Sequence, residues 1–104
     1  MGNKSQNAEN LLKCIESFEK NIQLECDIYI KNSIKITQDD LTIDGNGHTI
    51  DAQNNSQIFN ITGNNITLKN IIFKNALTKK SGGAILNFKG TIKVIDCEFI
   101  NQNH

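Results

Sequence analysis

Four aspartates form the only cluster of acidic residues in this sequence, and they are the first candidates for chemistry. They are Asp39, Asp40, Asp44 and Asp51. Carboxylates that converge on one bond could hydrolyse a glycoside, and carboxylates gathered on one surface could hold calcium. Asp39 and Asp40 precede a short β-type segment, so their side chains are expected to point apart. Asp44 and Asp51 flank a turn, where aspartate commonly bonds the local backbone. We therefore predict structural roles for all four and no catalytic residue.

The other residues with reactive side chains lack the neighbours that catalysis or metal binding requires. His48 has no second histidine near it in the sequence. The turn Gly45-Asn46-Gly47 occurs once, whereas calcium-binding β-rolls repeat such a turn in tandem. Lys79-Lys80 is a short charge pair in a loop, which is typical of a solvated surface. These residues predict neither a metal site nor a phosphate-binding loop.

Cysteine usage and composition exclude further functions. Cys14, Cys26 and Cys97 contain no short CxxC pair, so we predict no zinc site and interpret them as small buried apolar residues. A Cys14–Cys26 disulfide is compatible with the spacing but is not indicated by it. The net charge is zero and the chain has neither arginine nor tryptophan, which argues against nucleic-acid binding. No apolar run approaches the ~20 residues of a membrane span, and no cofactor is predicted.

The elements that carry these residues follow a repeat. Leu41-Thr42-Ile43, Ile66-Thr67-Leu68 and Ile92-Lys93-Val94 are β-type triplets that recur after 25 and then 26 residues. A period of this length is typical of stacked supersecondary units. Each repeat contains about three very short strands, separated by corners rich in Asn and Gly. The pattern predicts an all-β stack of about three coils, in which like strands pair in parallel.

Stacked coils place equivalent side chains above one another, and the repeat predicts which ones. The predicted core ladders are Ile43 with Leu68 and Val94, and Phe73 with Phe99. The predicted asparagine ladders at the corners are Asn75 with Asn101, and Asn60 with Asn87. Amide side chains in such a ladder hydrogen-bond along the axis of the stack.

Residues 7–21 predict an amphipathic helix instead of a strand. Leu11, Leu12, Ile15 and Phe18 fall at helical spacing. The first coil of a stack would expose unpaired backbone and an open apolar bore. We predict that the helix caps this opening and buries Leu11, Ile15 and Phe18. Residues 1–6 are predicted to be disordered, and residues 22–104 to form the coils of the same domain.

The last repeat is interrupted near the end of the sequence. Val94, Phe99 and Ile100 are expected to lie at an edge that could pair with another copy of the chain. The N-terminus contains no apolar signal region. We therefore expect the chain to be a segment of a longer exported protein at the cell surface, and a cytoplasmic location is the alternative.

Several motifs resemble those of known families. Residues 41–51 resemble the first-coil signature of right-handed parallel β-helix proteins. Gly82-Gly83-Ala84-Ile85, Phe73-Lys74-Asn75-Ala76 and Phe99-Ile100-Asn101-Gln102 resemble the GGAI and FxxN repeats of polymorphic outer-membrane proteins and archaeal (methanogen) adhesin-like proteins. The resemblance covers about residues 7–101. It implies a right-handed parallel β-helix of the pectin lyase-like type and a role at the cell surface.

The function predicted from these features is that of a non-catalytic structural or binding segment of an adhesin-like protein. Surface glycans or proteins of a host or partner cell would bind along an extended face, through loop side chains such as Asn54, Asn55, Lys74 and Lys79. Because the same fold hosts pectate lyases and polygalacturonases, a fragment of a carbohydrate-active enzyme is one alternative. A self-assembling module that pairs through its open last coil is the other.

Overall fold

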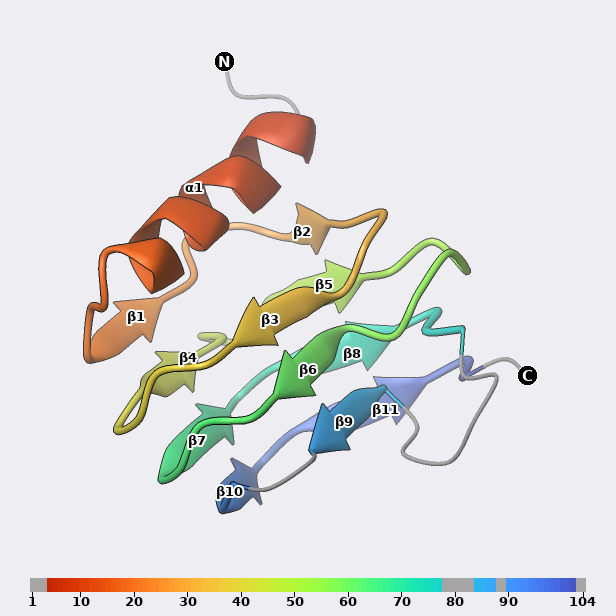
Figure 1. Ribbon diagram of the computed structural model, residues 1–104. Helices are drawn as coiled ribbons and strands as arrows, with labels where there is room; N and C mark the ends of the chain where they lie inside the picture. Colours follow the sequence, from red (N-terminus) through yellow and green to blue (C-terminus); the bar gives the residue numbers. More distant parts are fainter. Residues whose placement is uncertain (1–3, 78–83, 88–89, 103–104) are drawn as a thin grey trace.

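The computed structural model describes residues 4–77, 84–87 and 90–102, which form one helix followed by short strands (Figure 1). Helix α1 covers Lys4–Glu16. The strands are β1 (Asn21–Gln23), β2 (Ile28–Tyr29), β3 (Ile34–Ile36), β4 (Thr42–Asp44), β5 (Thr49–Asp51), β6 (Phe59–Ile61), β7 (Ile66–Lys69), β8 (Ile72–Lys74), β9 (Ile85–Asn87), β10 (Ile92–Ile95) and β11 (Glu98–Ile100). Strands this short need neighbours on both sides, which stacking supplies.

The strands stack into three parallel sheets. Their orders are β1-β4-β7-β10, β2-β5-β8-β11 and β3-β6-β9. Each full coil contributes one strand to each sheet, and β10 and β11 continue the stack beyond the third coil (Figure 1). This arrangement confirms the predicted fold class, an all-β parallel β-helix with one helix at its N-terminal end.

Asparagine and aspartate occupy the corners of the coils because the chain adopts a left-handed backbone there. Asp40 and Asn65 have φ values of 61° and 60° at one corner, and Asn75 and Asn101 have 57° and 53° at another. These residue types tolerate that conformation better than other side chains. The abundance of asparagine thus follows from the number of corners.

The bore of the coils is filled by ladders of apolar side chains. Ile43 pairs in register with Leu68, and Leu68 with Val94, so the three residues assigned to the aliphatic ladder occupy equivalent positions. Phe73 pairs with Phe99, and their rings stack with centroids 5.0 Å apart. Phe59 meets Phe73 edge to face at 5.9 Å. Phe59 and Phe73 are fully buried and join adjacent coils through one continuous core.

Helix α1 lies across the first coil (Figure 1). Leu11 and Ile15 are each only 4% exposed and belong to the core. The side chain of Gln38 donates a hydrogen bond from Nε2 to the carbonyl oxygen of Ile15 at 3.1 Å. The same carbonyl also accepts from the backbone N–H of Phe18 at 3.0 Å, so the bond from Gln38 is a second one, and it ties the end of the helix to the first coil.

The cap differs from the prediction at its C-terminal end. The helix stops at Glu16 instead of reaching residue 21, and Asn21 already begins β1. Phe18 adopts φ 58° just beyond the helix, so it leaves the helical spacing and is 66% exposed. Leu12 is 38% exposed on the flank of the helix. The covering of the bore therefore depends on Leu11 and Ile15.

The corner ladder predicted for Asn60 and Asn87 does not form. Asn60 pairs with Leu86, and Asn87 pairs with Ile61. A shift of one residue places two side chains on opposite faces of a sheet, so the two amides cannot stack. Asn87 instead bonds Gly90: its Nδ2 donates to the carbonyl oxygen of Gly90, and its Oδ1 accepts from the Gly90 N–H.

Several residues named in the sequence predictions lie outside the described residues. They are residues 1–3 of the predicted disordered segment, Lys79, Lys80, Gly82, Gly83 and residues 103–104. Residues 4–6, which belong to the same predicted segment, lie in α1.

Candidate functional site

The clustered aspartates each bond the coil that follows them. Asp39 accepts a hydrogen bond from the backbone N–H of Asn64 at 2.8 Å. The other three aspartates accept from an asparagine side-chain amide: Asp40 from Asn65 at 2.8 Å, Asp44 from Asn70 at 3.2 Å, and Asp51 from Asn75 at 3.1 Å. In each case donor and acceptor are one coil apart in sequence. Their carboxylates act as clamps between coils, and we call these four bonds the inter-coil clamps.

Two of the aspartates also bond the turn that they begin. Asp44 accepts from the N–H of Asn46 at 2.9 Å, and Asp51 accepts from the N–H of Gln53 at 2.7 Å. These are the local backbone bonds expected of aspartate beside a turn. In both residues the same oxygen, Oδ1, therefore accepts one hydrogen bond from the local turn and one from the next coil.

The clamp at Asp44 changes the acidity of that carboxyl group. The N–H of Asn46 and the side-chain amide of Asn70 stabilise the charged form, and Lys69 adds a favourable charge nearby. Together they outweigh desolvation and hold the pKa of Asp44 below its ordinary value of 3.8. A carboxylate with a depressed pKa stabilises the folded state only while it is ionised.

Replacing Asp44 with asparagine is expected to lower the thermal midpoint slightly at neutral pH and to have no effect in strong acid. The contribution of the carboxylate is present above its unfolded pKa and disappears as the pH falls through the lower folded value. The effect is small because the group lies at the surface, where solvent screens it. Thermal unfolding of both proteins across a pH series measures this difference. A difference that stays constant with pH would contradict it.

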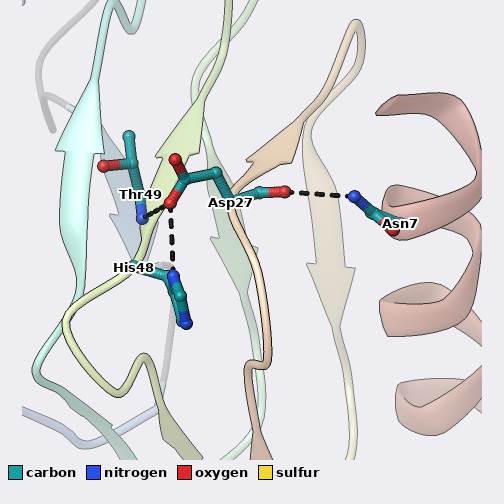
Figure 2. Close-up of polar contacts among 4 residues, drawn as sticks. All are labelled: Asn7, Asp27, His48 and Thr49. Atoms are coloured by element: carbon teal, nitrogen blue, oxygen red, sulfur yellow. Dashed lines mark hydrogen bonds and ion pairs between the residues drawn. The ribbon is translucent and has the colours of Figure 1, made fainter. Parts of the chain in front are cut away.

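Asp27 and His48 form a polar cluster between the first two coils (Figure 2). Oδ1 of Asp27 accepts from the N–H of Thr49 at 3.0 Å and lies 3.4 Å from Nδ1 of His48. Asn7 of α1 donates to the backbone oxygen of Asp27 at 3.4 Å, as Figure 2 also shows. The aspartate and histidine side chains are 52% and 32% exposed. The cluster therefore joins the cap, the first coil and the second coil at the surface.

The loop residues predicted to bind a partner lie near one another in part. Asn54 and Asn55 are exposed in the loop after β5, and the N–H of Asn54 donates to the carbonyl oxygen of Asn75 at 2.8 Å. Asn75 directly follows Lys74, which is half-buried on the outer side of β8. The structure thus brings Asn54 and Lys74 to the same edge of adjacent coils.

The cysteines and acidic residues of the described part of the chain do not form a metal site. Cys14, Cys26 and Cys97 are free thiols there, all partly buried. Burial raises the pKa of the Cys97 thiol. Among the described residues, no three side chains of the His, Cys, Asp and Glu types come together as a metal site. The same residues include no helix that is long and apolar enough to span a membrane.

The last coil exposes large apolar side chains. Val94, Ile95, Phe99 and Ile100 are 42%, 44%, 48% and 36% exposed. Val94 and Phe99 continue the core ladders, so their exposed sides face along the axis of the stack. Ile100 pairs with Lys74 on the outer side of the sheet. Two of the three predicted edge residues therefore lie in the opening of the bore, and the third does not.

The inter-coil clamps are the feature that sequence reasoning missed. The sequence carried a signal for them, since each clamping aspartate is followed by an asparagine after 24 to 26 residues. That spacing equals the coil repeat. A search for Asp–Asn pairs at the repeat distance, instead of Asn–Asn pairs, would have found them.

Comparison with known proteins places this geometry in a family. No curated protein and no solved structure matches the chain. A family model described as "Putative pectate lyase-like adhesive domain" matches residues 16–98. The match begins at the end of α1 and extends to β11, so it covers nearly all of the coils. The chain belongs to the family of pectate lyase-like adhesive domains.

Proposed function

We propose that this chain is a non-catalytic structural and binding segment of a cell-surface adhesin-like protein, of the type found in archaeal adhesin-like and polymorphic outer-membrane proteins. One observation carries the proposal: all four clustered carboxylates are engaged in inter-coil clamps. The acids that a glycoside hydrolase would need are thereby used to hold the stack together. The adhesive character of the family supports the same role.

Binding would use the outer faces of the coils. Surface glycans or proteins of a partner cell are the partners that suit an extended, polar and electrically neutral surface. Asn54, Asn55 and Lys74 lie on adjacent coils and supply amide and ammonium groups along one such edge. The proposed location is extracellular, as part of a longer exported chain.

A paired assay tests the proposal against its enzymatic alternative. Beads coated with the chain should adhere to polysaccharide-coated or cell-coated surfaces. The same preparation should release no reducing ends and no unsaturated products from polygalacturonate, with or without calcium. Depolymerisation that persists after repurification would overturn the non-catalytic role. Failure to adhere to any surface would overturn the binding role and leave only the structural one.

Self-association is a second candidate function, favoured by the exposed apolar opening of the last coil. Val94 and Phe99 present apolar surface there, and the strands β10 and β11 present backbone groups beyond their pairing with β7 and β8. An uncovered strand edge is a template for pairing with another chain. A second copy would cover both features at once.

Val94→Lys is expected to convert a self-associated form to a monomer, because it places a charge in the opening that the second copy would bury. Light scattering after size exclusion, over a concentration series, measures the mass. Ile100→Lys is the matched control, since it adds the same charge to the same coil on its outer side. Equal loss of association in both variants, or a wild-type chain that is monomeric at every concentration, would contradict pairing through the opening.

A further inference from the structure

A groove of about 450 Å³ opens between α1 and the corner that joins β2 to β3. We call it the cap groove. It exists because a single helix does not fill the opening of the first coil: α1 buries Leu11 and Ile15 and leaves Leu12 on its flank, 38% exposed. Ala8 and Leu12 form the helix side of the groove, and Ile30 and Ile34 line it from the coil. Ligand sites in proteins commonly have this size and an apolar base.

The rim of the cap groove carries polar groups with no net charge among them. Lys31 and Asn32 are exposed at the corner, and Glu9 is exposed on the helix. Gln53 reaches the groove from the loop after β5, and its Nε2 donates to the carbonyl oxygen of Ile30 at 3.1 Å. That bond holds one planar amide at the rim. The rim therefore offers donors and acceptors together with one positive and one negative charge.

Tyr29 adds an aromatic ring to this lining. A tyrosine side chain combines a broad apolar face with a polar tip. The groove on the other flank of α1 is lined by residues such as Asn10, Cys14 and Cys26 and contains no aromatic side chain. The shallow groove on the outer side of β1 and β4 also contains none. Of these three grooves, the cap groove is therefore the one whose lining includes an aromatic side chain.

We infer that the cap groove binds a neutral saccharide. A sugar ring has an apolar C–H face that suits Tyr29 and Leu12, and hydroxyl groups that suit the amides and charges of the rim. The balance of Lys31 against Glu9 favours an uncharged ligand over an acidic one. A phosphate group would favour a rim with net positive charge, whereas Glu9 offsets the charge of Lys31 here. This inference rests on the binding role proposed above and adds to it a ligand class and a place.

The composition of the chain gives a direct test. Tyr29 is the only tyrosine and there is no tryptophan, so the tyrosine emission, excited where the five phenylalanines do not absorb, comes from the cap groove alone. Titration with lactose, cellobiose or maltose at millimolar concentrations is expected to change that emission to saturation. Amide shifts in a two-dimensional NMR spectrum should appear in Ala8–Leu12 and Tyr29–Ser33. Digalacturonate, which is acidic, should bind at least about tenfold more weakly.

A pair of double variants separates the groove from the rest of the surface. Lys31→Ala with Asn32→Ala removes two exposed rim groups and is expected to weaken saccharide binding by about tenfold or more. Lys20→Ala with Asn21→Ala makes the same chemical change at two other exposed positions and should leave binding unchanged. Thermal unfolding of both variants confirms that each is folded.

The outcomes that overturn the inference are distinct from failure of the adhesive role. Unchanged tyrosine emission with every disaccharide, tighter binding of digalacturonate, or shifts confined to β1 and β4 would each overturn saccharide binding at the cap groove. Bead adhesion of the whole chain would still stand in those cases. Loss of bead adhesion together with depolymerisation of polygalacturonate would instead overturn the proposed function itself.

Discussion

Phe73→Ala is expected to destabilise the fold by about 3–5 kcal/mol, the range measured when a large buried aromatic residue is truncated. Phe73 is fully buried, stacks on Phe99 at 5.0 Å and meets Phe59 edge to face at 5.9 Å. Removing its ring leaves a cavity between coils and ends both ring contacts. A domain of this size is commonly stable by only about 5–15 kcal/mol, so the loss is a large fraction of the total.

Urea unfolding, followed by far-ultraviolet circular dichroism, measures the free energy of unfolding of this variant. Phe99→Ala is the matched control, because it makes the same truncation in the same ladder at a side chain that is 48% exposed. Its expected cost is no more than about 1–2 kcal/mol, since solvent already reaches much of the ring. Phe73→Leu keeps part of the volume and should remain folded if the alanine variant does not.

Equal costs for the two alanine variants would contradict this account of the core. They would show either that Phe99 is covered in solution or that the ladder carries little of the stability. The mass of the chain in solution tests the first explanation, because burial of Phe99 by a second copy would appear as a self-associated species.

The apolar ladders could be predicted from the sequence because the register of a stack follows its repeat. Ile43, Leu68 and Val94 sit at the same place in alternating triplets, and only one pairing puts all three inside. The same reasoning was wrong for Asn60 and Asn87, which lie 27 residues apart. The pairing of β6 with β9 joins residues that lie 26 apart, so Asn60 faces Leu86. The strand positions, and not the residue type, set the register there.

The sequence analysis missed the end of the cap and the inter-coil clamps for different physical reasons. Phe18 fits the helical spacing, but one residue with φ 58° ends the helix and turns its side chain to solvent. Backbone conformation at one residue leaves no periodic trace in the sequence. The clamps do leave one, since Asp51 and Asn75 are one coil apart, yet each aspartate taken alone is also a plausible turn residue. Function therefore had to be judged from what the carboxylates contact.

Gly63→Ala is expected to cost at least about 3 kcal/mol, at the upper end of what overpacking a well-packed site usually costs. A Cβ atom at Gly63 would overlap the backbone carbonyl of Gln38 in the coil below, and Gly90 lies in the same way against the carbonyl of Gly63. A flexible side chain could move aside, but a backbone carbonyl cannot without shifting its coil. The hydrogen bonds from Thr62 N–H to Ile36 and from Asp40 N–H to Asn64, both 2.9 Å, hold the coils on either side of this contact.

Gly47→Ala is the matched control, because it adds the same methyl group where nothing lies within 4 Å. Its cost comes only from the left-handed backbone at φ 82°, which is worth about 1–2 kcal/mol for a residue with a side chain. Urea unfolding gives both values, and amide exchange at Thr62 and Asp40 reports whether the coils separate. Gly63→Ala should therefore be the more costly change and should speed exchange at both amides. The reverse order would mean that the coils can move apart at this corner without loss, and that close backbone approach is not what requires glycine there.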